Sequence, residues 1–211
     1  MGTDVKPVIF LGGGGGADDS VRLDTIFFSK LSSNARILYI PTALEPERYA
    51  GASKWFAGVV RLYSKTINFV MMTDDNVEQF NLNDFDAVYV GGGNTYKLLD
   101  FIISNKLNKK LRAFIESGKL FYGGSAGAII TGKTIKTASA MDPRLNYKYD
   151  KGLNWLKGAS VSCHWPENEA SIVNLFKKEP QKIYCIPENC GLLFDINGTL
   201  VRKVGVGIKV L

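Results

Sequence analysis

The amino-acid sequence predicts an α/β protein whose mostly parallel sheet is covered by helices on both faces. Short apolar runs alternate with longer amphipathic runs through most of the chain, which is the rhythm of repeated strand, helix and strand units. The apolar runs are rich in β-branched and aromatic residues, as strands buried on both faces require. Near the carboxyl end, Asn197-Gly198 separates two further apolar runs and is typical of a hairpin turn. We therefore also expect antiparallel strands at one edge of the sheet.

The elements are expected in a regular order along the chain. In the first part, strands are predicted at residues 8–11, 36–40, 66–72, 87–90 and 120–122, and helices at 20–31, 47–63, 95–103 and 108–117. In the rest, we expect a strand at 161–163, a helix at 167–178, a strand at 182–186 and the hairpin strands at 191–194 and 199–203. This order is that of a sheet built mainly from strand-helix-strand units.

Length and composition favour one α/β domain over residues 1–211. The chain is 45% hydrophobic and has no linker rich in proline, serine or charge, so it can bury one full core. The basic residues exceed the acidic ones by 26 − 20 = 6, but they are scattered and form no stripe interleaved with aromatic residues, so no nucleic-acid partner is expected. Three cysteines without a CxxC pair predict neither disulfides nor a metal site, and no cofactor is expected.

No segment of the sequence predicts a secretory signal or a membrane span. The cysteine content fits a reducing compartment, so we expect a soluble cytoplasmic protein without a membrane partner. The oligomeric state is left open, and a homodimer is one option.

A GxSxG pattern, Gly123 to Gly127, follows the apolar run that ends at Tyr122. This is the spacing of a nucleophile elbow, in which a side chain two positions before or after the serine would collide with neighbouring backbone. The pattern predicts that Ser125 is a nucleophile and that the amide of Ala126 faces a developing oxyanion. Because the chain has 22 glycines, a chance match in a glycine-rich loop is the alternative.

The chain has a single histidine, His164, at the end of the predicted strand 161–163. A serine hydroxyl usually needs a base with a pKa near 7, most often an imidazole. A lone histidine is more often an ordinary core or surface residue. The elbow upstream makes His164 the candidate base.

Two further glycine turns follow predicted strands. Gly91 to Gly93 precede a helix that Asn94 or Thr95 would cap, and their free amides could supply a second oxyanion donor; an ordinary tight turn is the alternative. Gly12 to Gly16 fit a loose GxGxxA dinucleotide pattern, but the expected acidic residue after the second strand is replaced by Pro41-Thr42. We therefore interpret this run as a loop that lets backbone pass close to the site.

A formal phosphate-loop match at residues 127–134 is physically poor. Its central Ala128-Ile129-Ile130 is apolar and helical in character, whereas a phosphate-binding loop needs conformationally free residues.

The sequence resembles the peptidase E family of serine peptidases in three features taken together: the GGGNTxxLL segment at 91–99, the GxSAGA elbow at 123–128 and the single histidine at a strand end. This family is related to cyanophycinase and to class I glutamine amidotransferases. The resemblance implies a flavodoxin-like fold and hydrolysis of short peptides, aspartyl dipeptides being the best-known substrates. It implies Ser125 as nucleophile and His164 as base. It also implies Gly92 or Gly93 with Ala126 as the oxyanion hole, and Asn94 beside them at the substrate.

Two carboxylates compete for the third place in the triad. In peptidase E the acid falls where this chain has Ala140, and Asp142 lies two residues further on. Glu188 stands where cyanophycinase-like and amidotransferase-like proteins have a glutamate. Either could accept the Nδ1 proton of His164 and fix its tautomer. We favour Asp142 by a small margin over Glu188; a loop carboxylate that only caps a turn is the alternative for both.

The expected substrate is a small peptide or a related amide, with an altered or lost preference for aspartate. The arginines that the family has in the helix after the histidine are missing from residues 166–173, and Arg144 and Lys148 are the candidate substitutes. Two classes of function follow: a serine hydrolase that forms an acyl-enzyme, and a non-catalytic or nucleotide-binding protein of the same fold.

Overall fold

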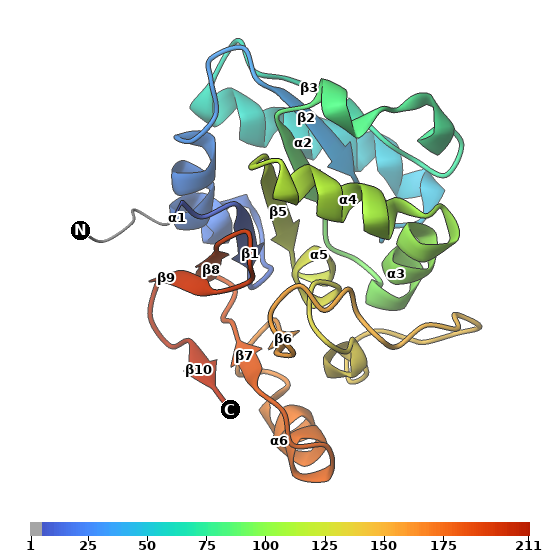
Figure 1. Ribbon diagram of the computed structural model, residues 1–211, viewed down its shortest axis with the longest axis vertical. Helices are drawn as coiled ribbons and strands as arrows, with labels where there is room; N and C mark the ends of the chain where they lie inside the picture. Colours follow the sequence, from blue (N-terminus) through green and yellow to red (C-terminus); the bar gives the residue numbers. More distant parts are fainter. Residues whose placement is uncertain (1–5) are drawn as a thin grey trace.

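A computed structural model describes residues 6–211 of the chain (Figure 1). Within these residues the main sheet has seven strands in the order β3-β2-β4-β5-β1-β8-β9. Their bounds are β1 (Ile9–Gly12), β2 (Arg36–Ile40), β3 (Asn68–Met71), β4 (Ala87–Val90), β5 (Leu120–Gly124), β8 (Gly191–Phe194) and β9 (Leu200–Val204).

The first five strands of the main sheet are parallel, and β8 and β9 extend it antiparallel beyond β1. The prediction of a mostly parallel α/β sheet with antiparallel strands at one edge is therefore confirmed. In the register, Gly12 pairs with Gly124 and Val90 with Gly123, so β1, β4 and β5 end together. Loops at the carboxyl ends of such strands are where α/β proteins place their sites.

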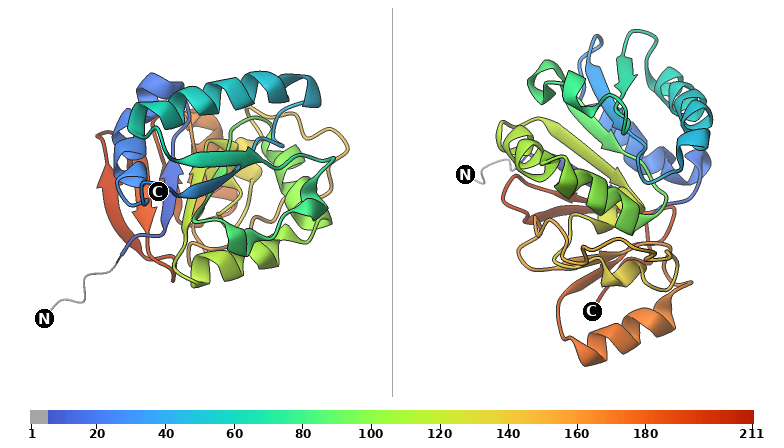
Figure 2. Two further views of the ribbon diagram at one scale, coloured as in Figure 1. Left: turned by 90° about the horizontal axis from the view of Figure 1, so that it is seen from above. Right: turned by 90° about the vertical axis from the view of Figure 1, so that its right-hand side faces the viewer.

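Helices pack on both faces of this sheet (Figure 2). They are α1 (Ala17–Phe28), α2 (Tyr49–Tyr63), α3 (Thr95–Ser104), α4 (Leu107–Glu116) and α5 (Ala126–Ile129). One apolar cluster joins α1 and α2 to one face through residues such as Phe27 and Phe56. A second cluster joins α3, α4 and α5 to the other face through residues such as Leu98 and Phe114. The position of each helix follows from the apolar stripe that it buries.

Helices α1, α2, α4 and α6 (Glu169–Lys178) begin one to three residues away from the expected positions, and for α1 and α2 the local structure gives the reason. Helix α1 starts at Ala17 because the Asp19 side chain accepts a hydrogen bond from the Gly16 amide at 2.8 Å and caps this end. Helix α2 starts at Tyr49, after a short 3₁₀ turn, η1 (Pro46–Arg48), that opens with a proline.

The sequence did not indicate that the strands around the histidine form a separate small sheet. In the described residues this sheet has the order β10-β7-β6, with β6 (Ser160–Ser162), β7 (Ile183–Cys185) and β10 (Lys209–Val210). It lies beside α6 (Glu169–Lys178), below the main sheet in Figure 1. Strands of two or three residues carry too little pattern to predict their pairing partners.

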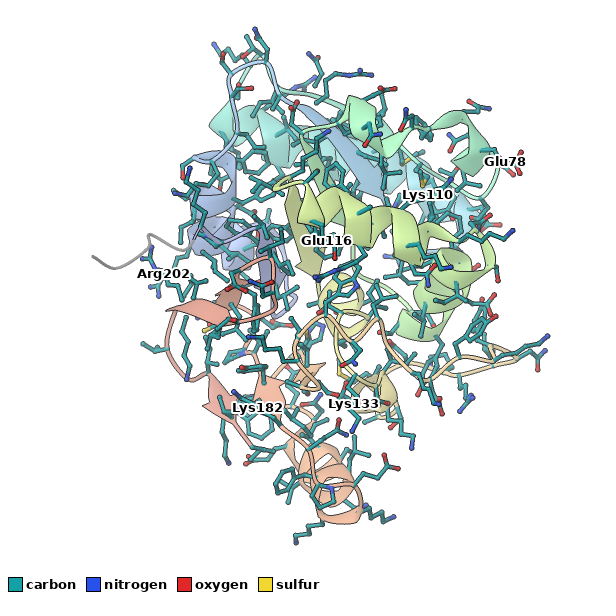
Figure 3. All side chains as sticks on the ribbon, in the orientation of Figure 1. Glu78, Lys110, Glu116, Lys133, Lys182 and Arg202 are labelled. Atoms are coloured by element: carbon teal, nitrogen blue, oxygen red, sulfur yellow. The ribbon has the colours of Figure 1, made fainter. Side chains whose placement is uncertain are left out.

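The surface carries most of the charge. Lys110, Lys133, Lys182 and Arg202 are exposed and lie on the outside of the ribbon (Figure 3). Among residues 6–211, no helix is long and apolar enough to cross a membrane.

Candidate active site

The elbow lies between β5 and α5. Ser125 has φ 49° and ψ −110°, a backbone conformation that residues other than glycine rarely adopt. A Cβ on Gly123 would lie 2.3 Å from the carbonyl oxygen of Gly127, and a Cβ on Gly127 would lie 2.5 Å from the carbonyl oxygen of Val90. Both flanking positions therefore need glycine for the reason expected from the sequence.

The imidazole of His164 reaches the serine from the small sheet. Its Nε2 lies 2.8 Å from Ser125 Oγ, a distance typical of a hydrogen bond. The His164 backbone amide donates to the carbonyl oxygen of Gly13 at 2.9 Å. A Cβ on Gly14 would lie 2.3 Å from Cε1 of the ring. The run of glycines after β1 thus leaves the space that the imidazole occupies.

Glu188 is the carboxylate beside the histidine. Its Oε1 lies 2.7 Å from His164 Nδ1, and its side chain is 41% exposed. Strands β6 and β7 are parallel, with Ser162 opposite Cys185, so the loops that carry His164 and Glu188 leave the same end of the small sheet.

The structure does not place Asp142, the acid that we favoured, against the histidine. Asp142 Oδ2 instead accepts a hydrogen bond from the Thr95 amide at 2.8 Å, in the first turn of α3. The free amides and the positive end of a helix attract such a carboxylate. Asp142 still lines the same cavity as Ser125, but its oxygen is bound to a different partner.

The second glycine turn lies against the serine. A Cβ on Gly92 would be 3.2 Å from Ser125 Cβ and 3.7 Å from Ser125 Oγ. Gly93 has φ 136°, and a Cβ there would meet the Ala43 carbonyl oxygen at 2.5 Å. The amide of Ala126 opens α5 directly after the serine. Backbone of the Gly91–Gly93 turn and of the elbow itself therefore lies next to the serine.

Asn94 holds the neighbouring backbone. Its Oδ1 accepts from the Lys97 amide at 3.0 Å and caps α3, while its Nδ2 donates to the Pro143 carbonyl oxygen at 2.8 Å. Both ends of the amide have a partner within the protein, so the structure gives Asn94 a capping role.

Ser125, His164, Glu188 and Asp142 line one cavity of about 400 Å³. Its walls include residues that the sequence did not single out as site residues: Leu44, Arg48, Trp55, Tyr89, Tyr122 and Cys190. Tyr89 and Tyr122 lie within strands of the sheet and Leu44 and Arg48 follow β2, so their position relative to the strands could have indicated them, whereas Trp55 lies within α2. Arg144 and Lys148, the expected arginine substitutes, are not among the lining residues. Arg144 packs over the Tyr96 ring at 5.9 Å and donates to the carbonyl oxygen of Lys148.

A buried carboxyl lies behind the cavity wall. Asp24 on α1 is 1% exposed and accepts a hydrogen bond from Ser20 Oγ at 2.7 Å. Burial raises its pKa to about 6, against the lowering effect of hydrogen bonds from Ser20 and Tyr122. Ser20 and Tyr122 both line the cavity.

Cys163 lies behind the elbow and is fully buried, with its Sγ 3.6 Å from the Ser125 carbonyl oxygen. Burial raises the pKa of this thiol far above its ordinary value, so it stays protonated and unreactive. Among residues 6–211, no group of three or more histidine, cysteine or acidic residues could hold a metal ion.

The fold and the site define a class: an α/β protein with a serine, a histidine and a carboxylate in one hydrogen-bonded chain, placed at the carboxyl ends of parallel strands. The family model of peptidase family S51 matches residues 8–201, and the chain therefore belongs to this family.

Several peptidases are similar in sequence. Peptidase E of Shewanella denitrificans is 29% identical over 121 residues, which cover 54% of this chain and 48% of the relative. An uncharacterized peptidase of Listeria innocua is 33% identical over 127 residues, covering 59% and 60%. Peptidase E of a Nostoc species is 29% identical over 182 residues, covering 82% and 74%. This chain thus matches about half to three fifths of the length of the first two relatives.

Two solved structures share the fold. A Listeria monocytogenes protein provisionally assigned to peptidase E has a TM-score of 0.67 at 23% identity, with 97% of this chain and 98% of that chain covered. A peptidase from an acI-B1 actinobacterium has a TM-score of 0.69 at 17% identity, covering 98% and 97%. At these identities the likeness concerns the fold.

Proposed function

We propose that this protein is a serine peptidase that hydrolyses short peptides or related small amides through an acyl-enzyme on Ser125. The proposal rests above all on the continuous chain from Ser125 Oγ to His164 Nε2 at 2.8 Å and from His164 Nδ1 to Glu188 Oε1 at 2.7 Å. Family membership over residues 8–201 supports the same conclusion.

In the proposed reaction, His164 Nε2 removes the proton of Ser125 Oγ as the oxygen attacks the scissile carbonyl carbon. The carbonyl oxygen becomes an oxyanion, which the amides of Ala126 and of Gly92 or Gly93 stabilise. The imidazolium then gives its proton to the leaving amine as the C–N bond breaks. Water attacks the resulting ester with His164 again as base, which releases the acid and restores the serine hydroxyl.

Glu188 has a positioning role in this proposal. By accepting the Nδ1 proton of His164, it holds the tautomer that leaves Nε2 free to accept a proton. Its charge also stabilises the imidazolium that forms during both steps. Asp142, bound to the Thr95 amide, has no part in this chain.

The substrate is proposed to be small because the cavity that contains the serine has a volume of only about 400 Å³. Helix α6 and the turn before it contain no arginine, so recognition of aspartate from that side is not expected. Nucleotide binding at the glycine run has no observation in its favour, since the His164 ring packs against Gly14.

A fluorophosphonate probe tests the proposed function. We expect one covalent adduct on Ser125, located by mass spectrometry of the digested protein, and none in the Ser125→Ala variant. His164→Ala should slow labelling by about 100-fold or more because the hydroxyl then lacks its base. Absence of labelling in the unmodified protein, or labelling that does not depend on His164, would contradict the proposal.

A further inference from the structure

The backbone of His164 has a conformation that its neighbours must maintain. Its φ is 54°, in the left-handed region that residues other than glycine seldom adopt. Such a conformation persists only where the surrounding contacts determine it. The contacts that hold this residue therefore decide where its imidazole points.

The peptide unit between Cys163 and His164 is held at both edges. On one edge, the His164 amide donates to the Gly13 carbonyl oxygen at 2.9 Å. On the other edge, the Cys163 carbonyl oxygen accepts from Asn168 Nδ2 at 3.0 Å. Because φ of His164 measures how this peptide unit is rotated about the N–Cα bond, the two hydrogen bonds together fix it. Among residues 6–211, no other protein group donates to the Cys163 carbonyl oxygen.

Asn168 stands where an asparagine ordinarily caps a helix, but its side chain has other partners. It directly precedes α6, and its side chain forms no hydrogen bond with the first turn of that helix. Asparagine is favoured at such a position because its side-chain oxygen can accept from the helix amides. Here Nδ2 donates instead to the Cys163 carbonyl oxygen and to Ser162 Oγ, each at 3.0 Å. The side chain thus serves the strand that leads to the histidine rather than its own helix.

The burial of Asn168 makes this arrangement costly. The residue is 5% exposed, and its Oδ1 has no hydrogen-bond partner among residues 6–211. A buried polar atom without a partner is unfavourable, so packing alone would favour an apolar residue of similar size at this position. The two donations from Nδ2 are what an asparagine offers here and an apolar residue does not. Of these two, the bond to Cys163 acts on the peptide unit before the histidine.

From these contacts we infer that Asn168 is a positioning residue for the base. Through the Cys163 carbonyl oxygen, it keeps the peptide unit before His164 in the orientation that directs Nε2 to Ser125 Oγ. Asn168 is not among the residues that line the cavity, so it acts on a substrate only through the histidine. This role rests on the proposed function, because a fixed imidazole matters for catalysis only if it acts as the base.

Two variants separate the bond to Cys163 from the other contacts of this amide. Asn168→Leu keeps a similar side-chain volume but removes both donations. Ser162→Ala is the matched control, because it is also buried and removes only the donation from Asn168 Nδ2 to Ser162 Oγ. Urea denaturation shows that each variant is folded and measures its loss of stability. Asn168→Ser, a smaller polar change, takes the place of Asn168→Leu if the latter does not fold.

The first readout is the reactivity of the serine. We expect Asn168→Leu to slow fluorophosphonate labelling of Ser125 by about tenfold or more. It should lower kcat on a cleavable short peptide by a similar factor, with KM within about twofold. The reason is that a displaced base weakens the transition state but not the binding of the substrate. Ser162→Ala should stay within about threefold of the unmodified protein in both measurements.

The second readout is the imidazole itself, which can be followed without turnover because the chain has a single histidine. In protein that carries ¹⁵N-labelled histidine, every imidazole signal in a nuclear magnetic resonance spectrum belongs to His164. In the unmodified protein and in Ser162→Ala, we expect a neutral ring with its proton on Nδ1, where Glu188 accepts it. Asn168→Leu should show an average of the two tautomers and a weakened Nδ1 proton signal, because the ring is then free to leave Glu188.

The outcomes separate this role from the proposed function. If Asn168→Leu is folded and its labelling, kcat and ring signals equal those of the unmodified protein, Asn168 does not position the base. The same conclusion follows if Ser162→Ala loses as much as Asn168→Leu, since the effect is then one of stability. If Ser125 of the unmodified protein is not labelled, the proposed function fails, and the ring signals still decide whether Asn168 holds the histidine.

Discussion

The serine and the histidine of this site come from two regions that are built in different ways. Ser125 lies on a turn whose backbone is fixed by close contacts between the main sheet and the first residues of α5, at Gly123, Gly127 and Val90. His164 and Glu188 come from loops of a small sheet with strands of two or three residues, and their position depends on how this sheet packs against the first. The elbow is thus a local structure, whereas the base and the acid are placed by tertiary contacts.

The two hydrogen-bond distances of the triad therefore depend on different parts of the structure. The 2.7 Å between His164 and Glu188 is set within the small sheet, because β6 and β7 pair directly. The 2.8 Å between Ser125 and His164 spans both sheets and passes by the glycine loop after β1. Perturbations that shift the small sheet should therefore change the distance between Ser125 and His164 before they change the distance between His164 and Glu188.

The largest expected effect is on the link between the two regions. Ser125→Ala and His164→Ala should each lower kcat/KM on a cleavable short peptide by a factor of about 10⁴ or more, and the double variant should be no worse than either single one. The reason is that the two residues act as one unit. Steady-state kinetics of the three variants measures this. A double variant whose loss equals the product of the single losses would show that they act independently.

The elbow itself can be tested by stability. Gly127→Ala places a methyl group 2.5 Å from the Val90 carbonyl oxygen and should lower the free energy of unfolding by about 3 kcal/mol. Gly58→Ala is the matched control: it lies within α2, has no atom within 4 Å of the added carbon, and should raise stability by up to about 1 kcal/mol. Urea denaturation measures both. Equal effects would mean that the elbow backbone adapts freely.

A smaller effect is expected for the acid, which acts through the histidine. Glu188→Gln should lower kcat by about 100-fold with little change in KM, because the amide can favour the wrong imidazole tautomer. Asp142→Asn, a matched change of a carboxylate in the same cavity, should stay within about threefold. The reverse ranking in a kinetic comparison would reinstate Asp142 as the triad acid.

The smallest effect concerns the pH dependence of stability. Asp24 has a folded pKa of about 6, above its ordinary value of 3.8. The folded state therefore holds this proton more tightly, so the stabilisation is complete below pH 4 and is lost as the pH rises through 6. In Asp24→Asn, the fall in the free energy of unfolding between pH 4 and pH 7 should be smaller by roughly 2 kcal/mol.

Asp18→Asn is the control for this comparison, since it changes an exposed carboxyl on the same helix and should keep the original pH dependence. Urea titrations at several pH values measure the slope. A slope in Asp24→Asn equal to that of the control would show that Asp24 is ionised in the folded protein.

The local parts of the molecule were predictable from the sequence, and the reasons are physical. The parallel strands carry long apolar runs, and the elbow carries the glycines that its close contacts require. The hairpin edge followed from Asn197-Gly198, whose glycine has φ 74°. The hairpin turn and the close contact between Gly123 and Gly127 depend on neighbours within a few residues along the chain, and only the contact of Gly127 with Val90 comes from a more distant strand.

The choice between Asp142 and Glu188 depended on the path of two loops, which no local pattern encodes. Asp142 is drawn to the first turn of α3, while the pairing of β6 with β7 carries Glu188 to the histidine. Arg48 was missed because a lone arginine before a helix looks like an ordinary surface residue. Only the fold, which brings together loops distant in sequence, places Arg48 in the lining of the same cavity as Ser125.

The glycine run after β1 has a consequence for reading similar sequences. The run resembles a dinucleotide fingerprint because it needs glycine for a steric reason. The absence of a side chain at Gly14 leaves room for the imidazole ring of His164. Any larger residue there would displace the imidazole of His164. The same glycine pattern can therefore belong to a loop that packs against a side chain of its own protein or to a loop that binds a phosphate. The group that packs against the loop distinguishes these two cases.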